Sequence, residues 1–149
     1  IEGNGWEQVM SELVFERAGP ERFLTPMELL RQLIDALQGS TSEVARIAVG
    51  RLTAHLLTLR RLSRGITVTL AAGDNPTLQA SMVKDLGSIF EQELPEIARQ
   101  IVDVEPDISA RSQFCAVLAS IALQAPSYSL RGGTREILRG IIARGLGLR

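Results

Sequence analysis

Apolar side chains recur every three or four residues along most of the chain, which is the spacing of one face of an α-helix. The first run covers residues 4–18, and its apolar members are Trp6, Val9, Met10, Leu13 and Val14. Gly19-Pro20 interrupts the pattern, because proline lacks a backbone donor and disfavours helical geometry in the residue before it. The pattern resumes from Phe23 to Leu37, with Pro26 tolerated in a first turn. We therefore expect a broken first helical segment that ends at Gly39-Ser40.

Two longer apolar stripes follow. The first starts after Thr41 or Ser42, either of which can cap a helix, and runs to about Ala72. Its members are Val44, Ala48, Leu52, Leu56, Leu59, Leu62, Ile66 and Leu70. A turn at residues 72–76 separates it from the second stripe, which consists of Leu78, Met82, Leu86, Phe90, Leu94, Ile97 and Ile101. A helix of roughly 30 residues is about 45 Å long and needs long neighbours to cover its stripe, which predicts a bundle.

The rest of the chain also has helical spacing. Pro95 inside the second stripe predicts a kink or a local restart. Residues 103–106 read as a connector, 109–123 as a shorter apolar helix, and 125–127 as the approach to a glycine pair that precedes a last short helix. Strand-like alternation occurs only at residues 66–70, which lie on the first long stripe and are therefore assigned to its helix, so no strand is predicted. The predicted fold is all-α, an up-and-down bundle of long antiparallel helices of the four-helix-bundle type plus a short C-terminal helix, with residues 1–149 forming a single domain.

Composition narrows the possible functions. A chain of 149 residues with a net charge of −1 and 4% aromatic residues has neither the basic surface nor the stacking platforms of a nucleic-acid-binding protein. No signal peptide or membrane-spanning run is visible, so we expect a soluble, cytoplasmic protein with no membrane partner. The single cysteine, Cys115, cannot form an internal disulfide, and we interpret it as a small core residue without a catalytic role.

Several kinds of catalytic site are absent from the sequence. The only histidine is His55, and Leu52 stands three residues before it, so the Glu-x-x-His pairs of a di-metal bundle are missing. We therefore predict no metal site and place His55 on the helix surface or at the edge of the core. The chain also has no phosphate-binding loop, no dinucleotide fingerprint and no nucleophile elbow.

The C-terminal segment has the most specific pattern. Gly132 and Gly133 allow a left-handed backbone and close approach of a ligand, and Thr134 is placed to cap the helix that follows. By its chemistry alone this is a weak anion or amide site at a helix start.

The sequence of this segment is more informative, since Gly-Gly-Thr-x-Glu-Ile followed by Ile-Ile-Ala-Arg and Leu-Gly-Leu-Arg resembles the end of acyl-CoA dehydrogenases. Gly5-Trp6 with residues 9–17 resembles the first long helix of that family's C-terminal helical domain. Residues 73–84 and Gln100 resemble its third helix. The likeness spans nearly the whole chain.

The resemblance implies a flavin-dependent α,β-dehydrogenation of an acyl-CoA thioester, with FAD as cofactor and a separate electron-transfer acceptor. In that family a carboxylate removes the α proton, and the helical bundle follows an N-terminal helical domain and a β domain that this chain does not contain. We therefore expect the 149-residue piece alone to be inactive and to retain no FAD. The family assembles through the same bundle, which implies a homodimer or a tetramer.

The family places its catalytic base at one of two positions. One is the residue before Gly-Thr, which here is Gly132 and has no side chain to titrate. The other is the Glu of a Glu-Arg pair in the first long helix, and Glu16-Arg17 matches it. The resemblance thus implies Glu16 as base, Arg17 and Gly133 as substrate contacts, and as flavin contacts Thr134, Arg135, Glu136 and, from a neighbouring subunit, Gln100. Without the resemblance, the alternative interpretation of Glu16 is a solvated glutamate near the break that pairs with a neighbouring arginine.

The chain departs from the family pattern at three points. Asp103-Val104 replaces a glycine pair, residues 38–42 lack an Arg-x-x-x-Phe-Gly turn that reaches the flavin, and Arg131 stands where an aromatic often precedes the base position. Two alternatives therefore remain beside the enzyme. One is a partner or scaffold subunit with a degenerate flavin site, and the other is an unrelated helical interaction domain.

Overall fold

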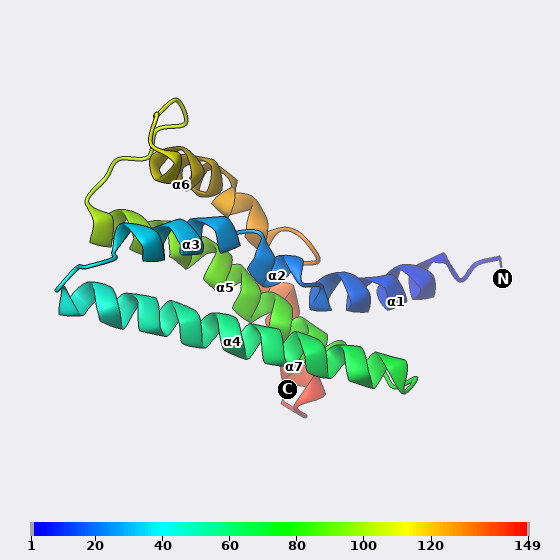
Figure 1. Ribbon diagram of the computed structural model, residues 1–149. Coiled ribbons are helices and arrows are strands. Elements are labelled where there is room, and N and C mark those ends of the chain that lie inside the picture. The colour runs from blue at the N-terminus through cyan, green and yellow to red at the C-terminus, as the bar shows by residue number, and fades with distance from the viewer. Residues whose placement is uncertain (1, 149) are drawn as a thin grey trace.

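The computed structural model describes residues 2–148, and within them all regular structure is helical (Figure 1). The elements in chain order are α1 (Gly5–Ala18), α2 (Glu21–Leu24), α3 (Met27–Ala36), α4 (Glu43–Ala71), α5 (Thr77–Val102), α6 (Gln113–Gln124), the 3₁₀ helix η1 (Ala125–Ser129) and α7 (Arg135–Gly145). The all-α prediction is confirmed for the described part of the chain.

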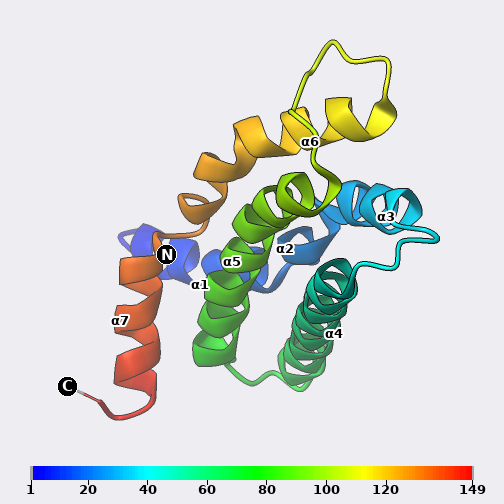
Figure 2. The same ribbon diagram turned by 90° about the vertical axis from the view of Figure 1, so that its left-hand side faces the viewer.

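Helix α5 is the centre of the bundle. It contacts each of the other helices, and α4 and α7 lie on different sides of it (Figure 2). The antiparallel pair α4 and α5 forms the long hairpin that the two apolar stripes predicted. The bundle is confirmed, but only these two helices are long, because the first arm is divided into α1, α2 and α3.

Prolines divide the first arm as expected. Helix α1 ends before Gly19, Pro20 precedes α2 and Pro26 precedes α3, where its missing backbone donor leaves no hydrogen bond unmade. Pro95 behaves differently. It is buried inside α5, and the helix continues from Thr77 to Val102 without the local restart that the sequence suggested.

Caps and turns fix most of the remaining helix ends. Ser42 caps α4 by accepting a hydrogen bond from the Ala45 amide at 3.3 Å, which confirms the predicted start. Asn75 accepts one from the Thr77 amide at 3.0 Å ahead of α5. The apolar helix predicted from residue 109 begins only at Gln113, and η1 was not predicted at all.

The core consists of two neighbouring clusters. The larger lies between α3, α4, α5 and α6 and includes Leu33, Leu59, Phe90, Leu94 and Leu118, all fully buried. The smaller joins α1 to the start of α5 and the end of α4 through Val14, Ile66 and Val83. The smaller cluster therefore fixes the C-terminal half of α1 against the bundle.

Some residues assigned to apolar stripes face outward. Trp6 is 75% exposed and Val44 69%. Trp6 lies in the first turn of α1, close to the N-terminus of the chain. Cys115 is half-buried, so it is not the core residue that we expected. His55 stands at the core edge, as predicted, with its ring edge-on to Phe90 at 5.3 Å between centroids.

Candidate functional site

The glycine pair ahead of α7 has a left-handed backbone. Gly132 has φ +67° and Gly133 φ +110°, conformations that residues with a Cβ rarely adopt. Thr134 follows in extended geometry as the N-cap residue of α7, which confirms the predicted start of the helix. The predicted side-chain cap is not formed, because the Thr134 hydroxyl accepts no hydrogen bond from the first turn.

The Glu16 carboxylate packs against the first of these glycines. A Cβ on Gly132 would lie 2.0 Å from Glu16 Oε2 and 2.9 Å from Glu16 Cδ, far closer than atoms approach in real structures. The carboxylate thus occupies the space in which a side chain at position 132 would begin. Glu16 Oε2 is buried and has no hydrogen-bond partner, although the side chain as a whole is 38% exposed.

Arg17 binds the same loop through its backbone. Its Nε donates to the Gly132 carbonyl at 2.8 Å across 115 positions of sequence. The residue is 3% exposed, and burial lowers the pKa of its guanidinium while Glu16 opposes that shift. Arg17 Nη1 is buried without a partner, so one donor of this guanidinium is still free. Glu16 and Arg17 together bring α1 and the glycine loop into one site.

One face of α5 holds the other side of the loop. Lys84, Ser88 and Glu91 fall at helical spacing and are all fully buried. Lys84 Nζ donates to the Tyr128 carbonyl at 2.6 Å, and Ser88 Oγ donates to the same oxygen at 3.1 Å. Arg131 donates to Glu91 at 2.7 Å. Hydrogen bonds with charged partners contribute about 1.5–3 kcal/mol each, so these contacts fix the path of the chain into the glycines.

The charges of this cluster are unequal, which shifts the pKa values of its members. Four cations, Arg17, Arg22, Lys84 and Arg131, lie near only two carboxylates, those of Glu16 and Glu91. Burial, and next the nearby Arg22, lowers the pKa of Lys84 to about 8. Burial raises the pKa of Glu91 against the opposing influence of Arg131. Burial and the Glu91 charge raise the pKa of Tyr128, whose ring lies 4.7 Å from the Arg131 guanidinium.

The predicted flavin contacts lie at two separate places. Arg135 donates to Asp85 at 2.8 Å, which ties the first turn of α7 to α5. Glu136 is exposed, and its own backbone amide and the Thr134 hydroxyl lower its pKa. Gln100 is exposed near the other end of α5, and 15 helical residues from Asp85 correspond to about 22 Å. Within one chain Gln100 therefore does not join the site at the glycine loop.

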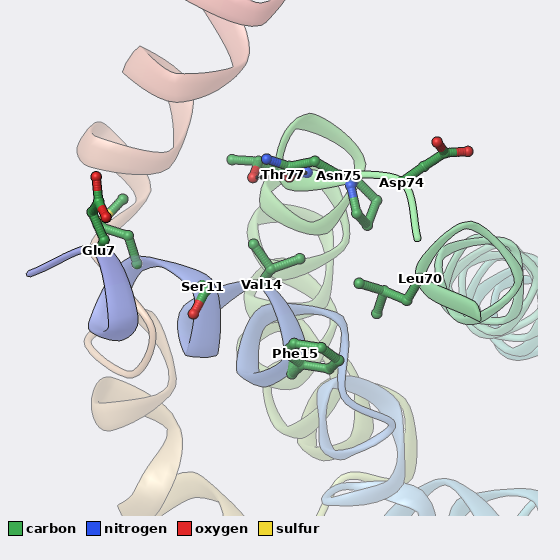
Figure 3. A pocket seen from close by; sticks show the side chains of 10 residues that line it. Glu7, Ser11, Val14, Phe15, Leu70, Asp74, Asn75 and Thr77 are labelled. Atoms are coloured by element: carbon green, nitrogen blue, oxygen red, sulfur yellow. Dashed lines mark hydrogen bonds between the residues drawn. The ribbon is translucent and has the colours of Figure 1, made fainter. Parts of the chain in front are cut away.

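Two hollows lie away from Glu16. One of roughly 710 Å³ between α4 and α5 is lined by Gln100, Arg51 and His55 among other residues. The other, of roughly 350 Å³, lies between α1 and the turn that joins α4 to α5 (Figure 3). Val14 and Leu70 point into the second hollow. We expected a cleft shared by Glu16 and Thr134, but these segments meet in a packed contact, and neither hollow is lined by either residue.

The sequence analysis missed most of the buried charged residues of this site. Arg22, Lys84 and Glu91 are at most 3% exposed, whereas charged residues are rarely buried to that extent. One signal was available, because Lys84 is the only lysine in the chain. The described residues contain no cluster of His, Cys, Asp and Glu suited to a metal ion and no helix long and apolar enough to cross a membrane.

Comparison with known proteins identifies the family of this all-helical bundle. The chain belongs to the acyl-CoA dehydrogenase family, C-terminal domain, whose model matches residues 3–147. No curated protein sequence matches the chain.

Solved structures have the same fold. The Tcur3481-Tcur3483 steroid ACAD is 19% identical with a TM-score of 0.78, and a variant of it is 20% identical with a TM-score of 0.79. The ChsE4-ChsE5 complex from Mycobacterium tuberculosis is 20% identical with a TM-score of 0.76. Each match covers 97% of this chain but only 40–41% of the other, so the chain spans about two-fifths of the length of these relatives.

Proposed function

We propose that this domain belongs to a flavin-dependent acyl-CoA dehydrogenase and supplies its catalytic base, Glu16. The observation that carries the proposal is the contact between Glu16 and Gly132. Of the two positions at which the family has its base, one is a glycine here, and the Glu16 carboxylate fills the space beside that glycine. A carboxylate at either position would thus reach the same place.

The surroundings of Glu16 suit proton abstraction from the α carbon of a thioester. Oε2 makes no hydrogen bond within the protein and is free to accept a proton, whereas Oε1 is paired with Arg22. A general base must come within hydrogen-bonding reach of the proton that it removes. The side chain as a whole is 38% exposed, but Oε2 itself is buried against Gly132, so a thioester that lies over α1 and the glycine loop must displace that contact to reach Oε2.

Residues around the glycine loop fit a flavin on one side. Gly133 has φ +110°, and its Cβ position is in ordinary van der Waals contact with Arg17 Nη2 at 3.6 Å, so the glycine is required by the backbone conformation of the loop. Thr134 leaves the amides of the first turn of α7 without a side-chain cap. We propose that Thr134, Arg135 and Glu136 hold FAD through this turn and that Gln100 contacts the FAD of a neighbouring subunit. When bound, FAD supplies a hydride acceptor for the β carbon.

Assembly and substrate follow from the same proposal. The α4–α5 hollow that contains Gln100 is flanked by exposed Val44 and Ile47, which favours a subunit contact there. We propose a homodimer or tetramer, or a pair with a second chain of the family as in the ChsE4-ChsE5 complex. The substrate is an acyl-CoA thioester. Steroid-derived thioesters belong in the test panel, because two of the similar structures are of a steroid ACAD. An electron-transfer acceptor and a cytoplasmic location stay predictions.

Replacing Glu16 by glutamine tests the assignment. Glu16→Gln keeps the shape of the side chain but removes its basicity, so the assembled full-length protein should bind flavin normally and lose about 10³-fold or more in turnover. Turnover is measured with butyryl-, octanoyl-, palmitoyl- and steroid-side-chain-CoA and an artificial electron acceptor. Glu12→Gln, one turn earlier on α1 and exposed, is the matched control. Unchanged turnover in Glu16→Gln would contradict the proposal.

The scaffold alternative has its own support. Arg131 is bound to Glu91 and stacked near Tyr128, so it does not replace the aromatic that often stands beside the base in this family. A scaffold subunit would bind no flavin at its own Glu16 in the assembled complex and would show no change in complex turnover on Glu16→Gln. The same experiment therefore distinguishes the two functions.

A further inference from the structure

We infer that Arg22 is the positioning residue of the Glu16 carboxylate. Arg22 can take this position because Gly87 has no side chain. This inference rests on the proposed role of Glu16. Arg22 Nη2 donates to Glu16 Oε1 and also approaches the Glu16 backbone carbonyl at 3.4 Å. Side chain and backbone of Glu16 are thus held by one guanidinium, which fixes the carboxylate relative to its own helix.

The Gly19-Pro20 break makes this pairing possible. On a continuous helix, residues three or four apart are neighbours, and residues six apart do not face each other. Glu16 and Arg22 are six apart, and they meet because the chain ends α1 and turns into the single turn of α2. The break therefore brings the Arg22 guanidinium into contact with the Glu16 carboxylate in the last turn of α1.

Arg22 has little else to bind. It is 3% exposed, and its Nε and Nη1 are buried without hydrogen-bond partners. Its neighbours in charge include Lys84, whose pKa falls partly because of it. A buried guanidinium among other cations is costly unless a carboxylate compensates it, and Glu16 is the carboxylate that it contacts. The pairing is therefore directed at Glu16 and is not a general surface ion pair.

Gly87 determines how closely α2 approaches α5. A Cβ on Gly87 would lie 2.7 Å from Arg22 Cβ and 3.2 Å from the Arg22 carbonyl oxygen. The backbone oxygen and the Cβ cannot move independently of α2, so any side chain at position 87 would push Arg22 away from α5. Gly65 in α4 is also a mid-helix glycine, and a Cβ there would meet nothing within 4 Å.

The two carboxylate oxygens of Glu16 therefore have different surroundings and different proposed roles. Oε1 is bound to Arg22, and Oε2 rests unpaired against Gly132. Without Arg22 the carboxylate can rotate, and the unpaired oxygen loses its fixed position over the glycine loop. A misplacement of about 1 Å in a reacting group can slow a reaction about 100-fold.

The test compares variants in the flavin-loaded, full-length protein in its assembled form. Arg22→Gln should lower kcat by about 10- to 100-fold with KM changed less than about twofold, because substrate binding does not use Arg22. Arg22→Lys keeps a donor and a charge and should recover part of the loss. Gly87→Ala keeps the arginine but moves it and should lower kcat by about 10-fold, whereas Gly65→Ala should leave kcat unchanged. Arg31→Gln, an exposed arginine paired with Glu28 and Asp35, is the second control.

Two further readouts separate positioning from a merely structural role. A thioester deuterated at the α carbon, chosen as the one of the panel that reduces the flavin fastest, should give a larger isotope effect on kcat in Arg22→Gln, because proton removal becomes slower. Crystal structures of Arg22→Gln and Gly87→Ala should show the Glu16 carboxylate rotated away from Gly132. If Arg22→Gln does not fold, the kcat and the isotope effect of Gly87→Ala alone test the positioning role of Arg22.

The outcomes also separate this inference from the proposed function. If Glu16→Gln has full turnover, the proposed function fails and this inference with it. If Glu16→Gln is inactive while Arg22→Gln and Gly87→Ala keep normal kcat and isotope effects, only the positioning role is wrong. If kcat falls in proportion to lost flavin with an unchanged isotope effect, Arg22 is structural and the inference is overturned.

Discussion

Adding a single methyl group at Gly132 should lower turnover strongly, because it displaces the Glu16 carboxylate, while it lowers the stability of the protein only modestly. In Gly132→Ala the new Cβ would lie 2.0 Å from Glu16 Oε2 and 3.1 Å from Oε1. Ordinary contact requires about 3.5 Å or more, so the carboxylate must move by more than 1 Å. A displacement of that size predicts a loss of turnover of about 100-fold or more. The left-handed φ of +67° adds a backbone cost of about 1–2 kcal/mol.

Gly39→Ala is the matched control for backbone strain. Gly39 has φ +78°, but a Cβ there would meet nothing within 4 Å. Both variants should therefore lose a similar 1–2 kcal/mol or so of stability, while only Gly132→Ala loses turnover. The assays are the thermal midpoint, the flavin content and the steady-state rate of the assembled full-length protein. Wild-type turnover in a folded, flavin-loaded Gly132→Ala protein would refute the contact between Glu16 and Gly132 as the basis of function.

Two further predictions concern the domain and its buried lysine. The 149-residue chain alone should retain no stoichiometric FAD, since most flavin contacts are expected elsewhere; a flavin absorbance spectrum checks this, and an equimolar signal would contradict it. Lys84 has a pKa of about 8 in the folded protein against 10.5 for a free lysine, so between these values the unfolded state holds more protons and stability rises with pH. The thermal midpoint of wild type relative to Lys84→Met should thus increase from pH 8 to 10.5, and a constant difference would show that Lys84 does not titrate in that window.

The arrangement around Glu16 accounts for the glycine at position 132 and for one departure from the family pattern, Arg131. Gly132 makes room for the carboxylate, and Arg131 is turned toward Glu91 and Tyr128. In the proposed function, a base carried on α1 and a glycine in the loop are therefore one structural solution. Gly87 belongs to the same solution in our proposal, because it lets Arg22 reach Glu16.

The sequence predicted the helices well because their signal is local. Apolar spacing of three and four residues and the prolines at 20 and 26 located α1, α3, α4 and α5, since both effects act within one or two turns. The same spacing failed where burial depends on a neighbour. Trp6 and Val44 fit the pattern but are exposed, and the pattern did not identify η1 or the late start of α6.

What the sequence alone determined is the fold class, the family and the two segments that carry the candidate site. What only the tertiary structure decided is how these segments meet: Glu16 on Gly132, Arg17 on the Gly132 carbonyl, and Lys84 on the Tyr128 carbonyl. Each of these contacts joins residues at least 40 positions apart, and which side chains share a buried space depends on how whole helices pack around α5. Helix periodicity is a local property of the chain, whereas the burial of charge at this site results from the packing of four separate segments.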